Sequence, residues 1–223
     1  MKNLLKLFVV VMGFTMATES YAQSFVVKGG LNLSKFLAKD DEGTYSDDFK
    51  MNPGFLFGVT SEFPISEVFS FETGLLLSSK GVKISEEESI FEEMVEFDSR
   101  VNLLYLDIPL LAKATADLGS AKIYGAFGPY IGMGLSGKIK SEFTSMGETE
   151  KTEEDVKWGS GEDDDFRRLD YGLSFGAGVE INAIQIGLSY GLGLANISPS
   201  SEGGAKVNNR VLGISLGYRF GGN

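Results

Sequence analysis

Apolar residues alternate with small or polar residues through three successive segments near the C-terminus, residues 169–181, 184–197 and 209–220. One parity of the first segment is apolar and consists of Leu169, Tyr171, Leu173, Phe175, Ala177, Val179 and Ile181. The opposite parity is small or acidic and consists of Asp170, Gly172, Ser174, Gly176, Gly178 and Glu180. Because side chains in a strand point to alternate faces, each segment predicts a strand with one apolar and one small or polar face. A glycine-rich face suits a narrow barrel interior better than a solvent-exposed surface, so we expect the apolar face to meet lipid.

Extended along the whole chain, the same alternation predicts eight strands. They span residues 25–34, 54–63, 69–82, 99–113, 121–138, 169–181, 184–197 and 209–220. Most exceed the ~9–11 residues that a tilted strand needs to cross a bilayer. Pro109 and Pro129 fall inside predicted strands, and each should mark a bulge or an unpaired position, since proline cannot donate to the ladder. The predicted fold class is therefore all-β, an eight-stranded antiparallel transmembrane up-and-down β-barrel.

The links between the predicted strands alternate in length. The long links span residues 35–53, 83–98, 139–168 and 198–208, and the short ones span residues 64–68, 114–120 and 182–183. Short turns at one end and long loops at the other are typical of bacterial outer-membrane barrels. With the N-terminus in the periplasm, the long loops face outside the cell. We expect proteases to cut them there on intact cells, at Lys151 or Arg167 in the longest loop.

The start of the chain has the pattern of a secretory signal peptide. Lys2 and Lys6 flank the start of an apolar run at residues 7–14, and residues 20–22 form a small-x-small cleavage pattern. The run is shorter than the ~20 residues that a membrane-spanning helix requires. We therefore predict that residues 1–22 are a signal peptide that is cleaved.

The remaining residues, 23–223, are expected to form one outer-membrane β-barrel domain. No other stretch resembles a membrane-spanning helix. An exported chain without such helices can span a membrane only as a closed barrel, because lipid leaves unpaired backbone groups without partners. The predicted location is the bacterial outer membrane, and we expect a monomer surrounded by outer-membrane lipid.

The composition excludes several classes of function. The chain has 31 acidic against 20 basic residues and a formal net charge of −11, whereas nucleic-acid binding requires a basic face. It has no cysteine and no histidine, so disulfides, thiol catalysis and the commonest general base and transition-metal ligand are absent. We therefore expect no enzymatic activity, no catalytic residues and no cofactor.

Two groups of carboxylates in the long links suggest calcium binding. One group comprises Glu150, Glu153, Glu154, Asp155, Glu162, Asp163, Asp164 and Asp165, and the other comprises Glu86, Glu87, Glu88, Glu92, Glu93 and Glu96. Oxygen ligands suit calcium, but the spacing matches no calcium-loop pattern. Like charges in a row are usual in solvated loops, so no metal site is predicted.

Eight charged residues fall on the inward parity. They are Lys28, Glu62, Glu72, Lys80, Asp107, Lys113, Glu180 and Arg219. One reading is an ion path or an acid–base pair, and the other is mutual pairing. An eight-stranded barrel is just wide enough for side chains to fill it, and buried charges have to be paired, which favours pairing and a closed lumen. Glycines on the same parity still leave room for a pocket suited to a small apolar or zwitterionic ligand: Gly176, Gly178, Gly187 and Gly191.

Seven aromatic residues recur along the predicted strands. They are Tyr105, Tyr124, Tyr130, Tyr171, Tyr190, Tyr218 and Phe220. They could line a ligand groove, but amphipathic rings are favoured at the two membrane interfaces. We expect these residues to include the aromatic girdles.

Several stretches resemble a known family, the outer-membrane β-barrel domain widespread in Bacteroidetes and often labelled PorT-like. The resemblance rests on residues 170–180, Gly191-Leu192-Gly193-Leu194-Ala195-Asn196-Ile197, Tyr105-Leu106-Asp107-Ile108-Pro109-Leu110-Leu111, Gly128-Pro129-Tyr130 and Leu216-Gly217-Tyr218-Arg219-Phe220. It covers essentially all of residues 23–223, although such barrels commonly end on an aromatic residue and this chain continues past Phe220. The resemblance implies the barrel and its location, and it brings no catalytic residues with it.

The hypothesis for function is a non-enzymatic barrel with acidic external loops, serving a structural or surface-binding role toward a protein partner outside the cell or in the periplasm. A link to secretion or gliding machinery, implied by the resemblance, is one alternative. Others are a narrow passive channel and a soluble periplasmic barrel of lipocalin type. A small outer-membrane hydrolase or acyltransferase is disfavoured, because those chemistries depend on a histidine and the chain has none.

Overall fold

The computed structural model describes residues 23–45, 49–90, 93–145, 148–161, 163–200 and 202–221. For residues 86–90 and 93–95 only the backbone is described. The predicted signal peptide and its cleavage site lie outside the described residues, as do Gly222 and Asn223. Among the described residues, no helix is long and apolar enough to cross a membrane.

The described chain is built from strands. They are β1 (Ser24–Lys39), β2 (Phe49–Lys50), β3 (Asn52–Pro64), β4 (Phe69–Ile90), β5 (Glu93–Asp117), β6 (Lys122–Ser145), β7 (Glu148–Asp155), β8 (Leu169–Ile181), β9 (Ile184–Gly193) and β10 (Lys206–Phe220). One short 3-10 turn, η1 (Glu202–Gly204), precedes β10. The links of the short-turn end join β3 to β4, β5 to β6 and β8 to β9. The other end is the long-loop end.

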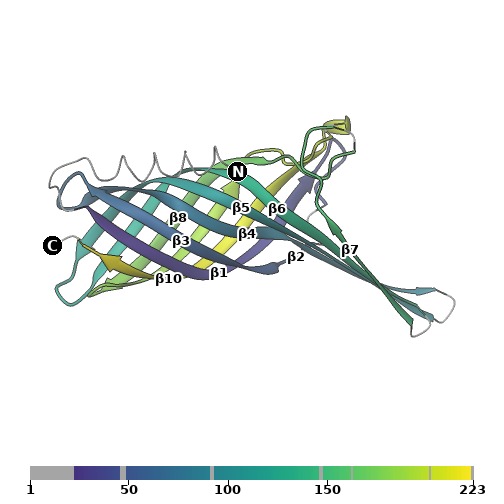
Figure 1. The fold of residues 1–223 in the computed structure, drawn as a ribbon, viewed down its shortest axis with the longest axis horizontal. Coiled ribbons are helices and arrows are strands. Elements are labelled where there is room, and N and C mark those ends of the chain that lie inside the picture. Colours follow the sequence, from purple (N-terminus) through teal and green to yellow (C-terminus); the bar gives the residue numbers. More distant parts are fainter. Residues whose placement is uncertain are drawn as a thin grey trace, which may run out of the picture.

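Eight strands form a closed ring in the order β4-β3-β1-β10-β9-β8-β6-β5, and β4 pairs with β5 to complete it. Every neighbouring pair is antiparallel, and β1 pairs with β10 along the registers from Phe25↔Phe220 to Lys39↔Lys206. Figure 1 shows these strands tilted around one barrel. The predicted eight-stranded up-and-down barrel is therefore confirmed.

Burial alternates along the strands, with the apolar face outward. On β3, Phe55, Phe57 and Val59 are exposed, whereas Thr60 and Glu62 are buried. A water-soluble barrel places these classes of residue the other way round. This inverted arrangement is the one that the sequence predicted for strands that cross lipid.

Three strands, β4, β5 and β6, run further than the sequence predicted at the long-loop end, and together with the unpredicted strand β7 they form an arm. β4 and β5 remain paired from Lys83↔Arg100 out to Ile90↔Glu93, and β6 continues to Ser145, where it pairs with β7. We define the arm as residues 83–90, 93–100, 138–145 and 148–155; Figure 1 shows it projecting beyond the barrel. The prediction of loops at residues 83–98 and 139–155 is wrong, because the ladders of the barrel continue into these segments.

The two internal prolines lie where the ladders are interrupted. Between β4 and β5, Ile108 and Pro109 have no register partner, and between β5 and β6 the register skips Gly128 and Pro129. The unpaired positions predicted from the prolines are therefore confirmed. The one register shift between β5 and β6 falls at Leu104/Tyr105 instead.

β9 is shorter than predicted. It ends at Gly193, whereas the sequence alternation runs to residue 197. Ala195 and Ile197 are buried after the chain has left the sheet. The alternation at residues 194–197 therefore does not reflect a strand, because Ala195 and Ile197 pack over the mouth of the barrel rather than in its wall.

Candidate functional site

A first layer of ion pairs crosses the lumen near the short-turn end. Lys28 and Lys113 both pair with Glu72, and Lys113 also pairs with Glu62. Arg219 joins Glu62 to Glu180, with its Nη2 atom 2.7 Å from Glu180 Oε2. Glu62, Glu72, Lys113 and Glu180 lie near the short turns, and Lys28 and Arg219 lie near the start of β1 and the end of β10. We call them the turn-side layer.

A second layer lies toward the long-loop end. Lys80 Nζ lies 2.9 Å from both Asp107 Oδ1 and Asp170 Oδ2. Asp170 also accepts hydrogen bonds from Tyr130 Oη at 3.2 Å and Asn209 Nδ2 at 3.0 Å. We call these five residues the loop-side layer. Asp170 is 0% exposed, so its charge depends entirely on these partners.

All eight charges that the sequence placed on the inward parity take part in these two layers, which confirms the pairing hypothesis. Asp170 is the member that the predicted set missed. Its parity predicts an inward side chain, but it is the second residue of β8, directly after the longest link. The five carboxylates of the two layers are Glu62, Glu72, Asp107, Asp170 and Glu180.

Three tyrosines of the predicted aromatic set line the lumen and are therefore not girdle residues. Tyr105 is 0% exposed, and Lys80 Nζ lies 4.6 Å from the ring centroids of both Tyr105 and Tyr130. Lys113 Nζ lies 4.2 Å from the Tyr124 centroid. These rings help to hold the cations away from water. The remaining four aromatics point outward and are exposed: Tyr171, Tyr190, Tyr218 and Phe220.

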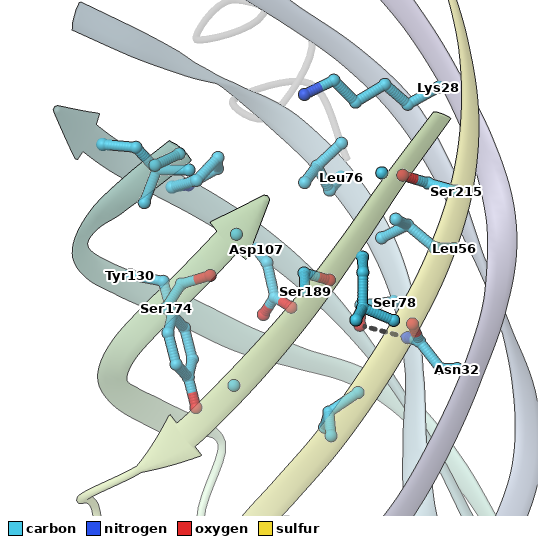
Figure 2. Close-up of a pocket in the computed structure, with 18 of the residues that line it drawn as sticks. Lys28, Asn32, Leu56, Leu76, Ser78, Asp107, Tyr130, Ser174, Ser189 and Ser215 are labelled. Carbon is cyan, nitrogen blue, oxygen red and sulfur yellow. Dashed lines mark hydrogen bonds between the residues drawn. The ribbon is translucent and has the colours of Figure 1, made fainter. Parts of the chain in front are cut away.

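A cavity of about 130 Å³ lies in the lumen, lined by residues of both layers. Figure 2 shows Lys28, Asp107 and Tyr130 among its lining residues, together with Leu56 and Leu76. Serine hydroxyls also line it, from Ser78, Ser174, Ser189 and Ser215. The cavity has room for several water molecules.

The glycines that the sequence assigned to a pocket mostly do line this cavity. Gly176, Gly187 and Gly191 belong to its wall. Gly178 does not, because a Cβ atom there would lie 2.5 Å from the Tyr124 ring, which already fills that space.

An apolar plug closes the long-loop end of the lumen. It is a buried cluster of Phe36, Val82, Leu103, Tyr105, Val156, Ala195 and Ile197, against which Trp158 and Phe166 pack. The Trp158 ring meets Tyr105 edge-on with centroids 5.7 Å apart, and Phe166 lies 5.7 Å from Phe36. Val156, Trp158 and Phe166 therefore fold back over the barrel mouth, and the prediction of a solvated loop is wrong for these positions of the longest link.

The arm has two faces of different chemistry. Its outer face continues the exterior of the barrel. Among the residues whose side chains are described, it carries five basic and five acidic ones: Lys83, Arg100, Lys138, Lys140 and Lys151 against Glu96, Asp98, Glu142, Glu153 and Asp155. Lys140 Nζ lies 2.8 Å from Glu153 and Lys151 Nζ lies 2.9 Å from Glu142. Hydrogen bonds from Lys138 and then Lys140 lower the pKa of Glu153 to about 2.

The inner face of the arm continues the lining of the lumen, since Ile84, Val101 and Ile139 pack against the plug. Further out, Phe97 and Phe143 are cross-strand partners and are 37% and 45% exposed. On β7 this face presents the carboxylates of Glu148, Glu150 and Glu154, which form no ion pair with a described side chain. The inner face is thus apolar and negative, whereas the outer face is balanced.

The family model of the outer membrane protein beta-barrel domain matches residues 21–198. The chain belongs to this family. The protein is accordingly an outer-membrane protein, and its exposed apolar belt faces lipid. A location in the outer membrane leaves no place for the soluble periplasmic alternative.

Several solved structures are similar to this outer-membrane barrel. The attachment invasion locus protein Ail of Yersinia pestis is 18% identical, with 90% of this chain and 100% of that chain covered and a TM-score of 0.34. Neisserial surface protein A is 14% identical, with coverages of 87% and 95% and a TM-score of 0.40. OprG from Pseudomonas aeruginosa is 14% identical, with coverages of 89% and 96% and a TM-score of 0.41. No curated protein sequence matches the chain.

Some acidic residues of the two carboxylate groups have other partners. Asp164 Oδ2 accepts the Gly161 N–H at 2.7 Å, and Asp165 Oδ2 accepts the Lys157 N–H at 2.8 Å. Within the described ranges, no group of three or more potential ligands is arranged to hold a metal ion. Glu92 and Glu162 lie outside those ranges, so the expectation of no metal site stays a prediction.

Trypsin on intact cells should cut this outer-membrane barrel at Lys151 and spare Arg167. Lys151 lies on the arm with its side chain 65% exposed, whereas the Arg167 backbone N–H donates to Ile197 at 2.8 Å and its Nη2 to Pro199 at 2.9 Å. Local opening limits proteolysis, so Arg167, held on the barrel mouth, should resist more than Lys151, which lies on an edge strand paired on one side only. Mass spectrometry of the released peptides checks this. Cleavage at Lys151 only after the outer membrane is broken would mean that the arm faces the periplasm and that the topology is the reverse of the one described.

Proposed function

We propose that the protein is a non-enzymatic, monomeric barrel whose role is to present the arm outside the cell to a protein partner. The observation that carries this proposal is a contrast between its two polar regions. The charges of the lumen are paired with one another, and the plug covers them. The inner face of the arm instead keeps exposed aromatic rings and carboxylates without ion partners, which is what a binding surface needs.

The absence of enzymatic activity is part of the proposal. The sequence has no histidine or cysteine. The buried carboxylates are each engaged by a lysine or arginine, so none of them is poised as a free base or nucleophile. A PorT-like identity, and with it a place near secretion or gliding machinery, is supported by the sequence motifs around residues 105–111 and 170–180.

The purified protein should show no steady conductance in planar bilayers. Eight strands leave an interior that side chains can fill, and both layers cross this lumen. The variant Trp158→Ala, which loosens the plug, should also stay silent because the two layers remain. A wide porin in the same bilayers serves as the positive control. Reproducible stepwise conductance from the unaltered protein would mean that it is a channel.

The partner itself can be sought by site-specific crosslinking on whole cells. A photoreactive residue in place of Phe143, on the inner face of the arm, should capture a protein. The matched position is Leu188, which is 54% exposed on the lipid-facing surface and should capture none. If no position on the arm or on the described long-loop end captures a protein, the surface-binding role is wrong.

A further inference from the structure

The strand β7 is a free edge of the arm. It pairs with β6 from Lys138↔Asp155 to Ser145↔Glu148, and no described strand lies on its other side. All eight of its residues are exposed. A strand in this position has unpaired N–H and C=O groups, which form a template for a strand from another chain.

The charges along this edge differ between the two faces. On the outer face, Lys151 and Glu153 are neutralised by partners on β6. On the inner face, Glu148, Glu150 and Glu154 lie opposite Ser145, Phe143 and Ile139, none of which carries a charge. An added strand would therefore meet uncompensated negative charge on every second residue, with Thr152 as the one neutral position.

A second copy of this chain fits the edge poorly. Antiparallel pairing of two β7 strands about their centres would set Glu148 opposite Asp155 and Glu150 opposite Glu153 of the other copy. Like charges directly opposite each other destabilise a sheet. The edge therefore selects against itself and favours a strand of the opposite sign.

We propose that the edge of β7 and the inner face of the arm bind an extended segment of a partner protein that carries lysine or arginine at every second position. This inference rests on the proposed function and names its surface and its class of partner. Main-chain hydrogen bonds to β7 hold the segment. Its basic side chains lie beside Glu148, Glu150 and Glu154, and their aliphatic stems extend toward the Phe97–Phe143 pair.

Binding of short peptides to the folded, full-length protein in detergent tests this directly. The probe is an eight-residue peptide with lysine and threonine in alternation. One control has the same composition with its lysines contiguous, and a second is N-methylated at every other residue, on the backbone nitrogens that face β7. The alternating peptide should bind, and both controls should bind at least about tenfold more weakly. Equal binding of the two lysine peptides would mean attraction by net charge only, and would overturn the proposal.

Protein variants test the face itself. The triple variant Glu148→Gln, Glu150→Gln, Glu154→Gln should bind the alternating peptide with about tenfold lower affinity, because three cross-strand charge pairs are lost. The matched control removes three exposed carboxylates outside the arm: Glu42→Gln, Glu67→Gln and Glu202→Gln. This control should leave binding unchanged. Electrophoresis with and without boiling verifies that both variants are folded, and an unchanged affinity in the first variant contradicts the proposal.

Crosslinking on whole cells separates this inference from the proposed function. If the unaltered protein captures a partner and the triple variant captures it equally well, the partner binds elsewhere, so the inference fails and the proposed function stands. If the unaltered protein captures no partner, the proposed function fails, whatever the peptides do.

Discussion

Replacement of Lys80 by methionine should lower the free energy of unfolding by about 3–5 kcal/mol, the cost of breaking a buried ion pair. Lys80 is the cation between Asp107 and Asp170, at 2.9 Å from each. Methionine has a similar length and no charge, so the variant leaves two neighbouring carboxylates inside the lumen. Urea titration in lipid vesicles, with the folded fraction read from electrophoresis without boiling, measures the change.

Two matched variants give this prediction its control. Adding Asp107→Asn and Asp170→Asn to Lys80→Met removes the stranded charges as well, and should restore much of the lost stability, because neutral groups need no counter-ion. Lys140→Met removes a cation from an ion pair on the exposed arm and should change stability little. If Lys80→Met costs no more than Lys140→Met, the loop-side layer does not stabilise the barrel.

Features that depend on alternation could be predicted from the sequence. The parity of β8, β9 and β10 is local information, and it fixes which side chains enter the lumen once a barrel is assumed. The ion pairs followed from the same parity, because opposite charges enclosed in a narrow space must meet. Lys113 and Glu62 are an example: their strands do not pair with each other, yet both side chains point inward.

The arm could not be predicted in this way, because its stability comes from pairs that the sequence does not announce. Glu148–Asp155 has the composition of a solvated loop. Only the register of β6 and β7 shows that Lys140 and Glu153 lie opposite each other. The plug also depends on contacts between residues far apart in the sequence. Trp158 packs against Tyr105 and Phe166 packs against Phe36 across the barrel mouth, and no periodic pattern in the sequence indicates these contacts.

The lumenal tyrosines differ from the arm and the plug, because the sequence does carry a signal for them. Tyr105 shares the parity of Asp107 and Lys113, the parity that predicts an inward side chain. The general preference of tyrosine for membrane interfaces points the other way, and parity is the stronger of the two here. On β6 the alternation changes phase at the register shift, so that Met133 and Ser136 are both exposed. The small residues on either side of the shift make this change of phase hard to see in the sequence.

Leu188→Arg should lower the free energy of unfolding in lipid by about 2–4 kcal/mol, the cost of a charge on the lipid face near mid-span. Leu188 lies in the middle of β9 between Ala177 and Ile214 and is 54% exposed on the barrel exterior. Its neighbour Ser189 lines the lumenal cavity. Ser189→Ala should change the free energy of unfolding little, because the cavity tolerates the loss of the hydroxyl group. The matched variant Ser189→Arg places the same charge one residue along the strand. Urea titration in vesicles measures the free energy of unfolding of both arginine variants. If arginine is harmless at 188 and strongly destabilising at 189, residue 189 faces lipid, and the two faces of the barrel have been assigned the wrong way round.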